Sequence, residues 1–183
     1  MTNYYIYLIS SFPSLHFGEK PPFSYERFLL SCRDFILEEE HELLTALPGI
    51  ADRSREAPHR GILRRWLEFD TALRNELAKA RAALRRVDPH RYTRPTTYDG
   101  PSLAHLAVNA RRNTSILDAE RSLDETRWRA LDDMAFGHYF DFEALVAYAL
   151  KLLILQRWER IRSADRSAVV EAVLPKVTGP LHA

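Results

Sequence analysis

Apolar positions recur every three or four residues along most of the chain, a pattern that predicts helices rather than strands. The clearest example is the stretch from about 60 to 86. Its apolar seam consists of Ile62, Trp66, Phe69, Leu73, Leu77, Ala80 and Leu84. We expect one helix of roughly 40 Å here, packed along its whole length against other helices.

Proline and capping residues divide the rest of the N-terminal half. A short first helix is expected over about 3–11, although its Tyr and Ile content also favours a strand. Ser24 can cap a second helix, which continues or restarts up to Pro48-Gly49, and residues 49–58 are expected to be loose.

Four polar residues predict where helices begin in the C-terminal half. Ser102 can cap a helix that ends near residue 112. Ser115 and Ser122 each stand three residues before an acidic residue, the spacing of a capping box, so two more helix starts are expected. Asp141 can cap a long apolar helix that follows Gly137.

Together these elements predict an all-α fold. We expect a single-domain bundle of about six to eight helices over 1–183, with long helices at roughly 60–86 and 141–162 and a last helix up to Leu174. The proline-containing stretch 87–101 is expected to be a long loop, either functional or packed as a lid.

Composition changes this picture little, with apolar residues at 46% and charged residues at 28%. The single cysteine, Cys32, excludes an intrachain disulfide and is expected to be a small buried hydrophobe. The most apolar run, Ala144 to Leu155, is 12 residues long and contains Lys151, whereas a membrane span needs about 20. We therefore expect a cytoplasmic protein with no direct membrane span, whose membrane association, if any, comes through a partner.

Charge is unevenly distributed along the chain. Residues 53–94 contain 12 Lys or Arg and 5 Asp or Glu, whereas residues 19–52 contain 3 basic and 8 acidic residues. The candidate partner-binding residues are Lys79, Arg81, Arg85 and Arg86 on the long helix. This basic stripe could meet an acidic protein or nucleic acid, or it could be an ordinary solvated face.

No catalytic constellation is visible. The chain lacks a phosphate-binding glycine loop, a Gly-x-Ser-x-Gly turn and a His-Glu-x-x-His pair, and its 7 histidines do not share ligand spacing on one helix face. We expect no catalytic, cofactor-binding or metal-binding residues, and neither binding nor hydrolysis of ATP.

For two further features we favour a structural role over a functional one. Trp66, Trp128 and Trp158 each follow an arginine. A buried tryptophan beside an arginine on the flank explains each pair, and divergent helical repeats are the alternative. Lys151 is expected to carry its stem along the bundle edge rather than to be a buried functional amine.

Three segments carry a resemblance to a known family: "YYIYLISSFPSLHFGEKPPFSYERFL", "RRWLEFDTALRNELAKARA" and "GHYFDFEALVAYALKLLILQRWER". The chain resembles an uncharacterised bacterial family encoded in operons for V-type (A/V-type) ATPases. Several of these operons lack a recognisable gene for the socket subunit, the all-helical part between the central rotor stalk and the membrane ring. The resemblance implies a shortened form of this socket subunit. The family has no catalytic residues that could be carried over to this chain.

The resemblance leads to the function that we expect. The protein would be a non-catalytic accessory or central-stalk subunit that couples or assembles rotor parts, with ATPase stalk or membrane-ring subunits as partners. It could thereby lie at the periphery of the inner membrane. The alternative is a helical adaptor or regulator that binds nucleic acid or an acidic protein through the basic stripe, with nucleic acid the less favoured partner.

Overall fold

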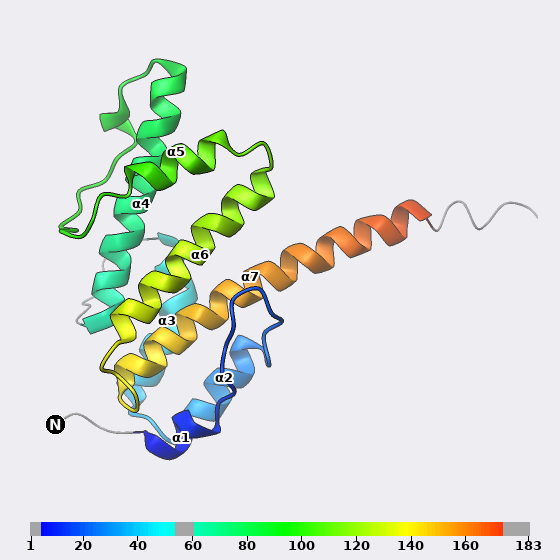
Figure 1. The fold of residues 1–183 in the computed structure, drawn as a ribbon. Helices are drawn as coiled ribbons and strands as arrows, with labels where there is room; N and C mark the ends of the chain where they lie inside the picture. The colour runs from blue at the N-terminus through cyan, green and yellow to red at the C-terminus, as the bar shows by residue number, and fades with distance from the viewer. Residues whose placement is uncertain (1–4, 54–60, 174–183) are drawn as a thin grey trace, which may run out of the picture.

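The computed structural model describes residues 5–53 and 61–173, with the backbone alone for 51–53 and 165–173. Within these residues every regular secondary-structure element is a helix, which confirms the all-α expectation (Figure 1). The α-helices are α1 (Ile6–Ser11), α2 (Tyr25–Cys32), α3 (Glu38–Arg53), α4 (Gly61–Arg85), α5 (Ala104–Arg112), α6 (Ile116–Ala135) and α7 (Phe142–Val173), and the short 3-10 helix η1 is Pro89–Arg91.

Helix α7 is the centre of the bundle. It contacts α2 and α3 on one side and α4 and α6 on another, and α5 packs on α4 and α6. The apolar run predicted from the sequence explains this position, since Leu145, Val146, Leu152 and Leu155 are all almost fully buried. Beyond the bundle α7 continues as a helix that points away from the other elements (Figure 1).

The end predicted for α3 at Pro48 is wrong, because the helix continues to Arg53. Proline lacks the N–H that would bond to the carbonyl of Leu44 one turn earlier. The hydroxyl of Tyr25, on α2, donates to that carbonyl instead at 2.7 Å. This buried hydrogen bond satisfies the carbonyl that the proline leaves without its helix partner. The expectation that 49–58 are loose is therefore wrong for 49–53, and residues 54–58 lie outside the described residues.

Helix α4 begins and ends within one residue of the prediction. The first part of its seam is buried, from Ile62 to Leu73. The expectation of packing along the whole length is wrong for the last turns, because Leu77 and Ala80 are half-buried and the Leu84 side chain is 63% exposed. The seam is therefore only partly covered in the last turns, although Ala82 beside it is buried.

Helices α5 and α6 follow the predicted caps in part. Ser115 caps α6 by accepting a hydrogen bond from the N–H of Asp118 at 3.2 Å. The second start predicted at Ser122 is wrong, because α6 is continuous and no Gly or Pro interrupts it. Helix α5 begins one residue later than Ser102 predicts, with Leu103 in the cap position.

Helix α7 begins at the predicted cap but does not end near residue 162. Asp141 accepts a hydrogen bond from the N–H of Ala144 at 3.1 Å. No separate last helix forms, because α7 runs unbroken to Val173 over a stretch without Gly or Pro. Leu174 lies outside the described residues.

A buried polar network joins α4, α6 and α7. Asp124 is 1% exposed and accepts hydrogen bonds from Arg127, Arg157 and the indole of Trp158. Arg127 also bonds to Asp70 on α4 at 2.8 Å. Burial lowers the pKa of the Arg127 guanidinium, but the carboxylates of Asp70 and Asp124 outweigh this effect and raise that pKa overall. A permanently charged arginine therefore connects the two carboxylates inside the bundle.

This network refines the expectation for the arginine–tryptophan pairs. The three tryptophans are buried, as predicted. Arg65 is exposed, but the Arg127 side chain is only 12% exposed and belongs to the core rather than to the flank. Cys32 is also fully buried, as predicted, and burial raises the pKa of its thiol to about 12. Among the described residues no helix is both long and apolar enough to span a membrane.

Candidate partner-binding surface

The last turns of α4 and its C-cap, residues 79–87, form a projecting end that we name the α4 tip. In Figure 1 this end of α4 lies at the top of the view, above α5 and α6. The tip contains the four basic residues selected from the sequence, and all four are exposed. It also presents Leu84, at 63% exposure, and Val87. Exposed apolar and basic side chains therefore occur together at this end of α4, with Arg81 toward α5 and α6 and Lys79 toward the proline-containing loop.

The backbone at the tip is fixed by the way α4 ends. The N–H of Val87 donates to the carbonyl of Ala82 at 3.1 Å, and the N–H of Arg86 donates to the carbonyl of Ala83. These two bonds form a Schellman motif, whose left-handed position usually holds glycine. Here Arg86 holds it, with φ at 53°. The chain therefore places a charged side chain at a strained position, which motivates a functional role for Arg86.

Most of the positive charge at the tip is not neutralised within the described residues. Lys79 pairs with Glu76 one turn earlier at 2.7 Å. Arg81, Arg85 and Arg86 have no carboxylate within ion-pair distance in the part of the chain that the structure describes. Three of the four predicted residues are thus free to meet an acidic partner.

A shallow groove of about 210 Å³ adjoins the tip between α4, α5 and α6. Arg81 and Arg111 stand at this groove. Its apolar lining includes Leu77, Ala80, Ala107, Ala110, Ile116 and Leu123. Small alanines on α4 and α5 leave the groove open, so an apolar side chain of a partner could enter beside two guanidinium groups.

The proline-containing loop covers α4 below the tip. Asn75 forms two hydrogen bonds with the backbone of Arg94, each 2.8 Å long. Thr97 donates to the Glu68 carboxylate and lowers its pKa below the ordinary range, and Tyr98 packs edge-on against Phe69. Of the two roles expected for this loop, the packed one agrees with these contacts. The loop covers the middle of α4, and its helix η1 contacts α4 as well, whereas the basic side chains of the tip, Leu84 and Val87 stay exposed.

Part of this surface was not predicted from the sequence. Ile116 lines the groove and is exposed, and Leu117 beside it in the chain is exposed as well. Ile116 and Leu117 stand in the first turn of α6, where the apolar period begins too early to face the core. Their apolar character directly after the Ser115 cap was the available signal.

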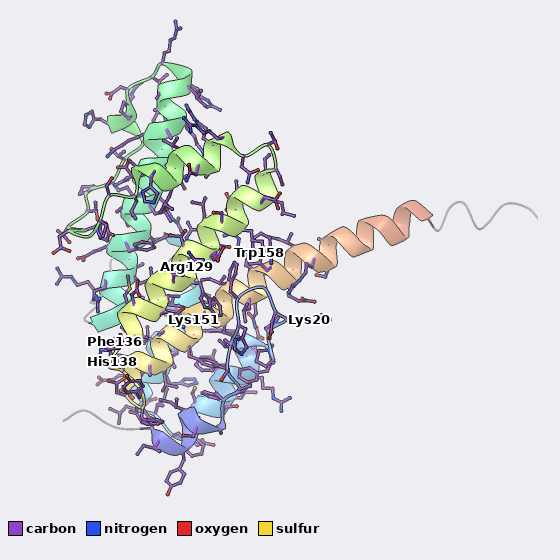
Figure 2. The ribbon with its side chains drawn as sticks, viewed as in Figure 1. Lys20, Arg129, Phe136, His138, Lys151 and Trp158 are labelled. Atoms are coloured by element: carbon purple, nitrogen blue, oxygen red, sulfur yellow. The ribbon has the colours of Figure 1, made fainter. Side chains whose placement is uncertain are left out.

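Lys151 and one of the histidines, His138, have structural roles. Lys151 forms an ion pair with Asp132 and lies 5.3 Å from the centre of the Trp128 ring, so its ammonium reaches the bundle edge (Figure 2). His138 bonds to Asp141 at 2.6 Å in the turn before α7. Among the described residues no three His, Cys, Asp or Glu side chains are grouped as a metal site would require.

Comparison with known proteins adds one match. Residues 101–170 match the model of DUF2764, a family described as proteins of unknown function. This region contains α5, α6 and most of α7, and it includes Asp124 and its partners on α6 and α7 but not α4. No curated protein matches the chain. No solved structure matches it either. The chain is therefore similar over this region to a family without an assigned activity.

Proposed function

We propose that this protein is a non-catalytic accessory or central-stalk subunit of a V-type ATPase, acting in place of the socket subunit between stalk and membrane ring. The α4 tip is its docking surface for an acidic face of a stalk or membrane-ring subunit. The resemblance described above supports the choice of assembly. One observation supports the docking surface: the apolar seam of α4 leaves the bundle at Leu84, among arginines without carboxylate partners in the described residues.

The arrangement suits a mechanical part better than an enzyme. Helices α4 and α7 are held at two points, so a force applied at the tip is transmitted to the centre of the bundle. One point is the polar network around Asp124. The other is the start of α4, where the Glu143 carboxylate of α7 accepts a hydrogen bond from the N–H of Ile62 at 2.6 Å.

The docking step follows from the chemistry of the tip. Exposed guanidinium groups attract an acidic face over a distance set by the Debye length, about 8 Å at physiological salt. Leu84 and the groove beside Arg81 then bury apolar surface at the centre of the contact. An acidic surface with one projecting apolar side chain is therefore the complementary partner.

The test is capture of partners from native cells with a tagged full-length chain, in parallel with and without nuclease. We expect ATPase stalk or membrane-ring subunits to be enriched and to persist after nuclease treatment, because the proposed contact is between proteins. Recovery of nucleic acid without ATPase subunits would replace this proposal with the helical adaptor. Capture without any ATPase subunit would also overturn it.

A further inference from the structure

A second uncovered surface lies between α2 and the start of α3, and we name it the α2–α3 groove. Its volume is about 700 Å³, larger than the groove at the α4 tip. Leu29 and Ile36 contribute apolar surface inside the groove, and the exposed Leu30 stands at its edge. The groove is thus wide enough to receive apolar side chains from a helix end.

The rim of the α2–α3 groove is acidic. Four carboxylates line it: Glu26, Asp34, Glu38 and Glu42, against one arginine, Arg33. None of these five side chains forms an ion pair within the described residues. The groove therefore combines an apolar floor with negative charge that this molecule does not neutralise.

The α4 tip has the complementary pattern, with exposed Leu84 and Val87 among Arg81, Arg85 and Arg86. The two surfaces cannot meet within one molecule. In Figure 1, α4 ends at the top of the view, whereas α2 lies in its lower part. Two molecules are needed to bring tip and groove together.

We propose that copies of this protein associate head to tail, with the α4 tip of one copy in the α2–α3 groove of the next. Opposite charges would be paired at the rim, and Leu84 would be buried at the centre. A pair joined in this way still has one free groove on the first copy and one free tip on the second, so the contact leads to a chain or a ring rather than to a closed two-fold dimer. The proposal does not depend on the ATPase as partner, although a tip occupied by another copy would be closed to it.

The test is sedimentation velocity of the full-length chain over a concentration series. We expect the weight-average sedimentation coefficient of the wild type to rise with concentration at low salt. The rise should be lost at about 1 M salt, where the Debye length is about 3 Å. A wild type that stays monomeric up to about 1 mM at low salt, well above the concentrations at which specific interfaces associate, would overturn the proposal.

Charge-reversed variants make the test specific to this contact. One variant carries Asp34→Lys and Glu42→Lys in the groove, and the other carries Arg81→Glu and Arg85→Glu at the tip. Each alone should remain monomeric, because its tip and groove then have the same sign. An equimolar mixture of the two should associate, because each tip finds a groove of opposite charge. A mixture that stays monomeric, or variants that associate alone like the wild type, would contradict the head-to-tail contact.

Matched controls keep fold and total charge separate from the contact. Glu19→Lys with Asp133→Lys changes the net charge as the groove variant does, and Arg65→Glu with Arg160→Glu matches the tip variant. All four control positions are exposed and line neither surface. Both controls should associate like the wild type, and helix content by circular dichroism should be the same in all variants. Loss of association in a control would assign the effect to net charge and contradict the proposal.

Discussion

At the scale of single residues, Asp124 has the most demanding environment. It is almost fully buried and accepts hydrogen bonds from two arginines and an indole on α6 and α7. Ser122 and Glu125 have the spacing of a capping box, and no local pattern indicates that Asp124, one of the two residues between them, belongs to the core. Its partners on α7 come from 33 and 34 residues away along the chain, and no local pattern contains them.

We predict that Asp124→Ala destabilises the fold by roughly 3–5 kcal/mol, because it leaves Arg127 buried with one of its two carboxylates missing. Asp133→Ala, on the exposed side of the same helix, should cost under about 0.5 kcal/mol. Urea denaturation of both variants measures the two changes. Equal stabilities would show that the network contributes nothing.

Tyr25 compensates for Pro48 through the carbonyl of Leu44. We predict that Tyr25→Phe costs about 1–3 kcal/mol, because the buried carbonyl then has no donor. The same substitution should cost less in a Pro48→Ala background, where the N–H of residue 48 can bond to Leu44 within the helix. A double-mutant cycle by urea denaturation tests this coupling. If Tyr25→Phe costs the same in both backgrounds, the hydroxyl does not replace the missing helix bond.

A substitution at Arg86 should affect the stability of the fold and the binding of a partner in opposite directions. With φ at 53° Arg86 occupies a conformation that glycine adopts without strain. We predict that Arg86→Gly stabilises the fold by about 0.5–1 kcal/mol and yet weakens partner capture, since one exposed charge is lost. Arg85→Gly is the matched control, because that position is helical and should lose stability instead. Stabilisation by both substitutions would argue against strain at Arg86.

At the scale of helices, the seam of α4 divides into a buried part and an open part. We predict that Trp66→Ala costs roughly 3–5 kcal/mol and Leu73→Ala roughly 2–5 kcal/mol, because both side chains are buried. Leu84→Ala continues the same seam but should cost under about 0.5 kcal/mol. Urea denaturation compares the three variants. A large loss for Leu84→Ala would mean that the tip packs against the bundle after all.

Periodicity and caps predicted that helices form and where several of them begin, whereas the ends of α3 and α7 and the contacts between helices could not be predicted. Ser24, Ser115 and Asp141 act as caps where expected, because a cap depends on residues within one turn. Pro48 does not end α3, because the Tyr25 hydroxyl, from another helix, satisfies the carbonyl that proline leaves open. Leu84 and Leu73 belong to the same regularly spaced apolar seam of α4. Only the arrangement of whole helices decides which of the two side chains is covered.

At the scale of the whole molecule, the same limit applies to the candidate surface. The basic residues of the α4 tip were visible in the sequence as a local charge excess. Their lack of carboxylate partners in the described residues depends on where α5 and α6 lie, and so does the groove beside Arg81. The acidic segment was also visible, but its place at the other end of the bundle follows only from the fold (Figure 1).

The most direct test of the α4 tip as docking surface is quantitative capture of ATPase subunits by three tagged chains. They are the wild type, a variant with Arg81, Arg85 and Arg86 changed to Glu, and a control with Arg27, Arg65 and Arg160 changed to Glu. The control residues are exposed and lie away from the tip. We predict that the control captures as much ATPase as the wild type and that the tip variant loses most of it while melting at a similar temperature. Equal capture by all three chains would contradict the account.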